Sequence, residues 1–233
     1  MNKGSKLLTG YVLILVMTLT AVQLGSRAVT VLSETTPIHR DHTIVIDAGH
    51  GGVDGGAVSC TGVPESRLNL EIALRLEAVF HLLGYDTEMI RTEDISVYTK
   101  GETIARKKIS DLKERVRRVN DTDNALLLSI HQNTFPDGRY SGAQVFYAGT
   151  AGSRELACQL QSALNSSLST GSRRQEKQAD GIYLMEHIRC RGVLVECGFL
   201  SNHQEEQRLR NADYQKKLSA VIACTTAQYL ANT

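Results

Sequence analysis

The sequence predicts an α/β protein, in which a single domain holds a mostly parallel or mixed sheet between two layers of helices. Short apolar runs alternate with segments of helical periodicity from about residue 43 to residue 230. Several of the runs, such as Thr43–Asp47 (TIVID) and Ala125–Ile130 (ALLLSI), are continuously apolar, which is typical of strands covered on both faces. These observations predict a three-layer sandwich with helices on both faces of the sheet.

The first half of the domain alternates strictly between predicted strands and helices. Pro64 suits a first helical turn, and Gly84 marks the end of the helix that follows it. On the next helix, Ile109 and Val119 are expected to face inward, while Arg115 and its basic neighbours form a solvated face. In order, the elements are a strand at Thr43–Asp47, a helix at about Pro64–Leu83, a strand at Tyr85–Ile90, a helix at about Thr103–Val119 and a strand at Ala125–Ile130.

The second half continues the alternation with shorter strands. Leucines recur every four residues from Leu156 to Leu168, which predicts a helix with one buried stripe. The elements are a strand at Ala143–Ala148, a helix at Glu155–Leu168, strands at Gly181–Met185 and Val193–Glu196, and a helix at Tyr214–Leu230. No internal repeat is visible, so one domain accounts for the whole pattern.

Composition excludes two classes of protein. The chain has 233 residues, of which 42% are hydrophobic and 22% charged, values that fit a globular domain and not a disordered or collagen-like chain. Its formal net charge is +1, with no extended basic block, so binding to nucleic acid through phosphate neutralisation is not expected. Tryptophan is absent and aromatic residues make up 5%, which also argues against stacking platforms for single strands.

The beginning of the chain has the pattern of an export segment. Lys3 and Lys6 precede an uncharged run from Leu7 to Gly25, and a basic start before such a run is typical of a secretory signal or an N-terminal anchor. The run is just long enough to span a bilayer. Because residues 26–28 (Ser-Arg-Ala) form a poor cleavage site, we favour an uncleaved anchor.

These features divide the chain into three parts. Residues 1–32 are predicted to be a signal peptide or N-terminal membrane anchor, residues 33–41 a polar linker, and residues 42–231 the folded domain. The domain is therefore expected outside the cytoplasm, held at the membrane or secreted.

Five cysteines are spread through the chain without CxxC spacing, so neither a zinc ribbon nor a thioredoxin-like motif is indicated. We expect most of them to be buried small hydrophobic residues, and their disulfide pairing stays open. They are Cys60, Cys158, Cys190, Cys197 and Cys224.

Three apolar runs end in side chains that can do chemistry. His50 follows the first run (TIVIDAGH), His131 follows ALLLSI, and Glu196 ends GVLVE. In open α/β sheets the active crevice lies outside the carboxyl ends of the strands, so these groups are expected to converge if the strands are parallel neighbours. A carboxylate that ends an apolar strand is costly without a partner, which makes Glu196 a functional candidate.

Two histidines with one nearby carboxylate would form a catalytic zinc site with an open fourth position. Glu65, in the helical turn after the glycine-rich loop that contains His50, is the best placed third ligand. The loop (GHGGVDGG) could instead cradle a phosphate, but it lacks a Gly-Lys-Ser/Thr ending and does not match GxGxxG. Outside this set, His81 is expected on a helix surface, and His187 and His203 in loops.

Four motifs in this order resemble one known family over about residues 43–229: DAGHGGVDGGAV, PESRLNL, SIHQN and VLVECGFLSN. The family is the zinc-dependent N-acetylmuramoyl-L-alanine amidases of bacterial cell walls. Three further stretches, KKISDLKERVRRVN, YSGAQVFYAG and GIYLMEH, are most similar to its germination-specific branch in endospore-forming bacteria. One departure is Ala48, which stands where the family usually has proline; it affects the stiffness of the loop and not the identity of the ligands.

The resemblance implies a site and a reaction. His50, Glu65 and His131 would hold Zn²⁺, Glu196 would be the catalytic carboxylate, and we expect Asn133 to bind polar groups of the substrate. The implied reaction is hydrolysis of the amide between N-acetylmuramic acid and L-alanine in peptidoglycan, which in spore cortex feeds muramic-δ-lactam formation. A deacetylase would act next, and some relatives need an accessory lipoprotein. The resemblance also implies that residues 42–231, as the catalytic domain, lie in the cell wall or the forespore intermembrane space.

Two alternatives remain at this point. A zinc exopeptidase or another peptidoglycan amidohydrolase could use the same metal ligands on a different bond. A wall-binding relative that has lost catalysis is a second possibility, although such a protein has no reason to keep Glu196 in a metal crevice.

Overall fold

The computed structural model describes residues 41–169 and 171–233. Within these ranges, no helix combines the length and the apolar character that crossing a bilayer requires. The predicted leader, residues 1–32, and all but the last residue of the predicted linker lie outside the described residues.

The centre of the domain is a six-stranded sheet with the strand order β2-β1-β3-β6-β4-β5. The strands β2, β1, β3 and β6 are parallel to one another, whereas β4 runs antiparallel to β6, and β5 is parallel to β4. The sheet is therefore mixed, as the sequence predicted. The strand bounds are β1 Thr43–Ala48, β2 Asp86–Met89, β3 Ala125–Asn133, β4 Gln144–Tyr147, β5 Lys177–Gln178 and β6 Arg191–Phe199.

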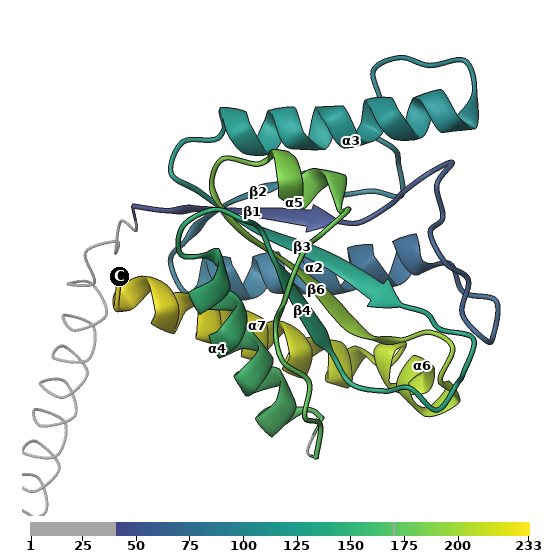
Figure 1. Ribbon diagram of the computed structural model, residues 1–233, viewed down its shortest axis with the longest axis vertical. Helices are drawn as coiled ribbons and strands as arrows, with labels where there is room; N and C mark the ends of the chain where they lie inside the picture. Colours follow the sequence, from purple (N-terminus) through teal and green to yellow (C-terminus); the bar gives the residue numbers. More distant parts are fainter. Residues whose placement is uncertain (1–40, 170) are drawn as a thin grey trace, which may run out of the picture. The chain divides into compact units, whose positions relative to one another are not determined.

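Helices cover both faces of this sheet, which confirms the predicted three layers (Figure 1). On one face α2, α4 and α7 pack together over an apolar core that includes Ile46, Leu128 and Val195. On the other face α3 and α5 cover a smaller apolar cluster that includes Val45, Leu127 and Leu194. The helix bounds are α2 Glu65–Leu82, α3 Ile104–Asp121, α4 Ser153–Ser167, α5 Tyr183–His187, α6 His203–Leu209 and α7 Ala212–Ala231.

The register of the parallel strands decides where the functional side chains meet. Ala48 of β1 lies beside Ile130 of β3, and His131 of β3 lies beside Glu196 of β6. Since the three strands run in the same direction, the residues that follow β1, end β3 and end β6 share one edge of the sheet. The convergence expected from the sequence is therefore present.

Three short elements differ from the prediction, and one of them is the two-residue strand β5, which is too short to leave a pattern in the sequence. The run Gly181–Met185, predicted to be a strand, instead leads into the helix α5, because a short apolar run has the same pattern in a strand and in one buried helical turn. The helix α6 was not predicted, since seven residues are too few to show a period. Its start is fixed locally by the Asn202 side chain, which accepts hydrogen bonds from the backbone N–H groups of Gln204 and Glu205.

The buried face of α3 is also rotated relative to the prediction. Ile109, expected inside, is 55% exposed, while Arg115, expected in solvent, is buried. The prediction was wrong because it assumed an apolar layer beneath the helix. Asp47 of β1 lies there instead, and its carboxylate binds the Arg115 guanidinium.

The cysteines are free, and most are not core residues. Cys60, Cys158 and Cys224 are exposed, Cys190 is half-buried, and Cys197 alone among the five is buried. The expectation that most would be buried was wrong, because two of the exposed cysteines lie on the outer sides of α4 and α7 and the third lies in the loop before α2.

Candidate active site

The loop after β1 brings His50 to the carboxyl edge of the sheet in an unusual backbone conformation. His50 has a φ of 61°, in the left-handed region, which turns the chain sharply after Gly49. A Cβ atom at Gly49 would collide with the His131 imidazole, and one at Gly56 would lie 2.6 Å from the carboxylate of Glu65. Glycine at these two positions lets the loop pack directly against the other two candidate ligands.

Glu65 is the first residue of α2, and its carboxylate contacts the imidazoles of both His50 and His131. Its Oε2 lies 3.3 Å from Nε2 of His50, and its Oε1 lies 3.0 Å from Nδ1 of His131. One donor atom from each residue can be chosen so that all three lie within 4.8 Å of one another. Two imidazoles and one carboxylate are a donor set typical of catalytic zinc sites, so the three residues fit a zinc ion.

The Glu65 carboxylate is fixed from several sides. Oε2 accepts a hydrogen bond from the backbone N–H of Ala57 at 3.0 Å, and Oε1 accepts bonds from the Gln132 backbone and the Asn69 side chain, both at 3.1 Å. Burial opposes ionisation, but hydrogen bonds from His131 and His50 outweigh it and hold the pKa of Glu65 well below its usual range. The carboxylate is therefore charged and oriented.

The electrostatic environment of His50 favours a positive charge. Burial alone would lower the pKa of its imidazole, yet the hydrogen bonds and negative charges of Glu65 and Asp54 raise that pKa to about 9. A group that holds a proton this strongly lies in a negative potential, and a bound cation can take the place of that proton.

Asp54 is a functional candidate that the sequence analysis missed. Its Oδ2 accepts a hydrogen bond from Nδ1 of His50 at 3.0 Å, and its Oδ1 forms an ion pair with Lys108 of α3 at 2.7 Å. A carboxylate on the far nitrogen of an imidazole fixes the tautomer that leaves Nε2 free for a metal. The available signal was its spacing of four residues from His50 inside the glycine-rich loop.

Glu196 lies next to this cluster with part of its carboxylate unsatisfied. It is the register partner of His131, and its buried Oε2 has no hydrogen-bond partner among the described residues. Burial raises the pKa of Glu196 to about 7; the Glu65 charge adds to that rise, while His131 and His50 oppose it. A carboxyl group with a pKa near neutrality can both accept and release a proton at physiological pH.

Beneath the crevice, Arg115 holds the backbone that carries His50. Its guanidinium binds the carboxylates of Asp47 and Asp111 and donates hydrogen bonds to the carbonyl oxygens of Ala48, at 3.0 Å, and His50, at 2.6 Å. Ser129 donates to the other oxygen of Asp47 at 2.7 Å. The network is buried and each of its charges is paired, as buried charges require.

A second buried arginine supports the same loop from the side of β2. Arg91 donates hydrogen bonds to the carbonyl oxygens of Ala48 at 2.8 Å, Gly49 at 3.1 Å and Ser66 at 2.8 Å. It therefore joins the loop of His50 to the first turn of α2, which carries Glu65. No pattern in the sequence indicated a role for Arg91.

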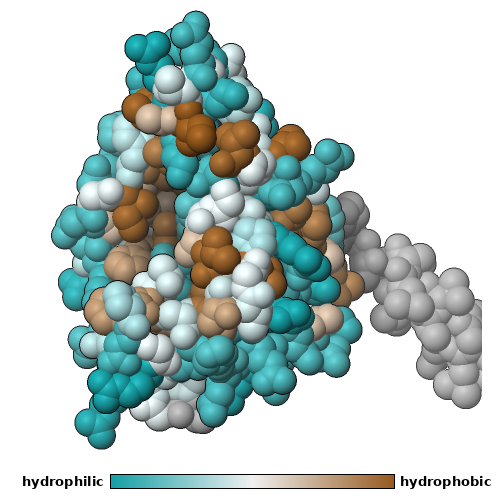
Figure 2. Space-filling view, turned by 90° about the vertical axis from the view of Figure 1, so that its right-hand side faces the viewer, coloured by the Kyte–Doolittle hydropathy of each residue, from teal (hydrophilic) through white to brown (hydrophobic). Residues whose placement is uncertain are grey.

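A cavity of about 190 Å³ opens beside the two histidines and is walled by α3 and α5. His50, His131 and Arg115 line one part of it, and Lys108 and Tyr183 another. Figure 2 shows the side of the molecule at which β1 and β3 end, where hydrophobic residues form separate patches among hydrophilic ones. Exposed hydrophobic residues in the loops at this edge include Val53, Val58, Ile95, Phe135 and Tyr140.

The other residues considered from the sequence are Asn133, His81, His187 and His203, and the structure places each in or beside a named element. Asn133 ends β3 two residues after His131; it is half-buried, and its carbonyl accepts a hydrogen bond from Leu200. His81 is on the surface of α2, as expected. His187 and His203 were expected in loops, but His187 ends α5, stacked on Tyr183, and His203 begins α6.

The fold and this cluster fit the class of metal-dependent hydrolases. Sequence comparison assigns the family. Residues 44–226 match the N-acetylmuramoyl-L-alanine amidase family, and the chain belongs to it. A germination-specific N-acetylmuramoyl-L-alanine amidase of Bacillus subtilis is 37% identical over 181 residues, covering 77% of this chain and 76% of the relative.

Two further relatives differ in how much of their own length this chain matches. The CwlD amidase of Clostridioides difficile, solved in complex with the GerS lipoprotein, is 34% identical with a TM-score of 0.79, and the match covers 82% of this chain and 99% of that one. The amidase LytC of Bacillus subtilis is 31% identical over 80% of this chain but only 35% of its own length, so this chain corresponds to about a third of LytC.

Proposed function

We propose that this protein is a zinc-dependent amidase that hydrolyses the amide bond between N-acetylmuramic acid and L-alanine in peptidoglycan. One observation carries the proposal: the donor atoms of His50, Glu65 and His131 lie within 4.8 Å of one another, and the unsatisfied Oε2 of Glu196 lies beside them. Structural carboxylates are paired, so an unsatisfied one next to a metal cluster supports a catalytic role.

His50, Glu65 and His131 would hold the zinc ion. When bound, zinc supplies a Lewis acid that polarises the scissile carbonyl and acidifies the attacking water. Asp54 keeps the His50 imidazole in the required tautomer, and Arg115 keeps the backbone of His50 in place through its carbonyl oxygen. The contacts of Asp54, Glu65 and Arg115 with His50 thus fix its position before substrate binds.

Glu196 would move the proton. Its Oε2 accepts a proton from the attacking water, and the same oxygen then delivers that proton to the nitrogen of the leaving L-alanine. The pKa of about 7 lets the group do both without a large energetic cost. Asn133, at the end of β3, would bind polar groups of the substrate on the same edge.

The relatives support a biological setting for this activity. The names of the Bacillus subtilis and Clostridioides difficile relatives indicate action in germination and assembly with a lipoprotein. We extend both to this chain: it would act on spore cortex, on the path to muramic-δ-lactam, with a deacetylase acting next and an accessory lipoprotein bound. Residues 1–32 would export the catalytic domain, residues 42–231, as a secretory signal or membrane anchor.

Analysis of digested muropeptides tests the proposed reaction. The purified zinc-loaded protein should release a free muramyl carboxyl group and a new N-terminal L-alanine from cortex and vegetative walls, measured by mass spectrometry after end-group labelling. Glu196→Gln is the matched control because it keeps the size of the side chain. Release of amino acids from the other end of the stem peptide, with no new N-terminal alanine, would instead show an exopeptidase.

A reporter fusion tests the proposed export. Residues 1–40 joined to a reporter that is active only outside the cytoplasm should produce signal. The same fusion with Lys3 and Lys6 changed to glutamate should produce less, since the basic start orients the segment. Signal only from a cytoplasmic reporter would refute export.

A further inference from the structure

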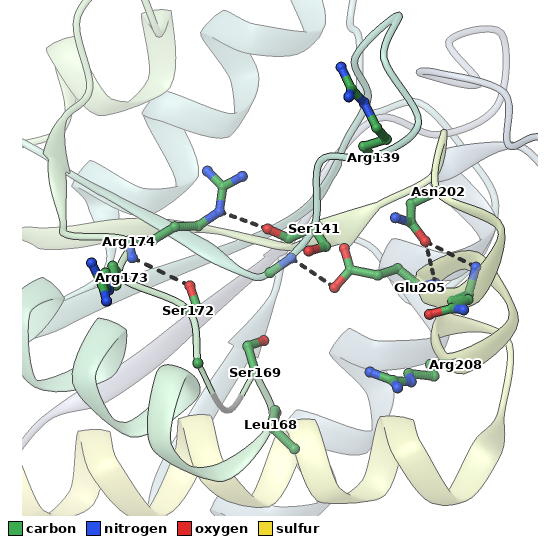
Figure 3. Close-up of a pocket in the computed structure, with 13 residues that line it drawn as sticks. Arg139, Ser141, Leu168, Ser169, Ser172, Arg173, Arg174, Asn202, Glu205 and Arg208 are labelled. Atoms are coloured by element: carbon green, nitrogen blue, oxygen red, sulfur yellow. Dashed lines mark hydrogen bonds between the residues drawn. The ribbon is translucent and has the colours of Figure 1, made fainter.

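A second and larger cavity, of about 790 Å³, lies apart from the two histidines. It is formed by the loop between β3 and β4, by residues 168–169 and 171–174, and by α6. Figure 3 shows Arg173 and Arg174 on one side of it and Arg208 on the other. Its volume is that of a site for a small molecule or a short peptide and not of a flat protein interface.

The arginines of this cavity are not neutralised by carboxylates. Among the described residues, Arg173, Arg174 and Arg208 form no ion pair, whereas Arg139 at the rim is paired with Asp137 at 2.7 Å. The buried Glu205 at the floor is engaged elsewhere, because its two oxygens accept hydrogen bonds from backbone N–H groups. The guanidinium groups of Arg173 and Arg208 are therefore available to a ligand, as is Nη2 of Arg174, whose Nε and Nη1 donate to Ser141 and Gln144.

This concentration of positive charge does not follow from the composition. Residues 41–233 contain 22 basic and 24 acidic residues, so the domain as a whole is slightly negative. Arg174 is also held in position: its Nε donates to the Ser141 carbonyl at 2.9 Å, and its guanidinium lies over the Phe199 ring at 4.9 Å. A guanidinium fixed in this way is prepared to bind a carboxylate through its remaining N–H groups.

The cavity lies within reach of the proposed catalytic carboxylate. Phe199, under Arg174, follows Glu196 by three residues in β6, which corresponds to about 10 Å along a strand. An extended peptide of three residues has about the same length. The exposed rings of Phe135 and Tyr140 pack edge to face with centroids 4.6 Å apart, and the Tyr140 ring lies 6.2 Å from that of Phe199.

We infer that this cavity binds the free carboxylates of the peptide stem of peptidoglycan, so that Arg173, Arg174 and Arg208 select substrates with an acidic stem. The inference rests on the proposed amidase function and adds the part of the substrate that lies on the L-alanine side of the cut bond. Arg173 and Arg208 contribute charge from opposite walls, and Arg174 provides the preoriented fork.

Two soluble muropeptides test the inference, one with free stem carboxylates and one with the same carboxylates converted to amides. The wild-type protein should cleave the acidic form with about tenfold higher kcat/KM, because charge-assisted hydrogen bonds are lost with the amides. The double variant Arg173→Gln/Arg208→Gln, which leaves only Arg174 in the cavity, should lose most of this preference. The amidated form should be cleaved equally by wild type and variant.

Arg210→Gln is the matched control. Arg210 is only two residues from Arg208, but its guanidinium is directed to Thr61 and Glu206, outside the cavity, so the preference should persist in this variant. A wild-type enzyme without preference, or a double variant that keeps it, would overturn the inference and leave the amidase function intact. The second result is also the one expected if the arginines bind an acidic protein partner.

If the wild-type protein cleaves neither muropeptide, the proposed function fails and binding still tests the cavity. Calorimetric titration with the free tripeptide L-alanyl-γ-D-glutamyl-meso-diaminopimelate should show binding to wild type and about tenfold weaker binding to the double variant. Equal binding to both proteins would overturn the inference by itself.

Discussion

Two buried charged groups at the same edge of the sheet are satisfied to very different degrees. Arg115, beneath the crevice, binds two carboxylates and two carbonyl oxygens. Glu196, in the second half of β6, has a buried oxygen that no described residue binds, and burial raises its pKa to about 7. The polar atoms of Arg115 are therefore bound within the protein, whereas Oε2 of Glu196 can still accept a hydrogen bond.

The difference separates structural from chemical use of a buried charge. Paired charges in a buried network fix geometry, and the loss of one partner destabilises the fold. An unpaired carboxylate lowers stability, so a fold retains it where a substrate or a water will complete its interactions. Substitution of Glu196 should therefore change mainly the catalytic rate, and substitution of Arg115 mainly the free energy of unfolding.

The largest effect is expected on catalysis, from Glu196→Gln. This change removes the proposed proton acceptor and should lower kcat by about 10²- to 10⁴-fold, while the zinc content stays near one per chain. Rates on a soluble muropeptide and metal analysis of the same sample measure the two effects.

Glu65→Gln provides the contrast, since it replaces a charged ligand with a neutral one. This variant should lose zinc first, and activity only as a consequence. If Glu196→Gln emptied the site while Glu65→Gln kept its metal, the two roles would have to be exchanged.

A similarly large effect, on stability instead of rate, is expected from Arg115→Met. The substitution leaves Asp47 buried without its cation, which should lower the free energy of unfolding by about 3–5 kcal/mol in urea titrations. Arg106→Met on the exposed side of the same helix should change it by about 0.5 kcal/mol or less. Equal effects of the two changes would show that the buried network does not stabilise the fold.

Asp54→Asn should have an intermediate effect that appears in metal affinity. Loss of the carboxylate behind His50 should weaken zinc binding by about 10- to 100-fold, because the amide no longer stabilises the imidazole orientation. Competition with a chelator of known affinity measures the change. Unaltered affinity would mean that the glycine-rich loop alone orients His50.

The smallest effect is expected on the pH dependence of stability in metal-free protein. Folding raises the pKa of Glu196 from 4.5 to about 7. Below pH 4.5 the group is protonated in both the folded and the unfolded state, and as the pH rises from 4.5 through 7 the folded state loses stability relative to the unfolded state. Glu196→Gln removes this loss and should be more stable than wild type by about 1–3 kcal/mol at pH 8.

The advantage of Glu196→Gln should shrink as the pH falls towards 4.5. His50, whose pKa is raised from 6.5 to about 9, stabilises the fold while it is protonated, and this contribution is lost as the pH rises through 9. Because both proteins contain His50, this loss affects both of them. Urea titrations at several pH values give the difference. A constant difference from pH 5 to pH 8 would show that Glu196 does not titrate in this range.

The sequence by itself determined the layers of the fold and the main candidates of the site. Continuous apolar runs and helical periods predicted the sheet and its two helix layers, because burial on both faces leaves a pattern in the residues themselves. His50, His131 and Glu196 could be found because each follows or ends a buried strand, and parallel strands end at a common edge.

Only the tertiary structure decided how these groups are supported and what surrounds them. The carboxylate partners of Arg115 are four and sixty-eight residues away, and no local pattern distinguishes a helix arginine that faces Asp47 from one that faces water. The helix α5 and the arginine-lined cavity likewise depend on segments that are distant in the chain. Buried charge pairs and cavities are products of packing between such segments, so their partners can be identified only after the chain has folded.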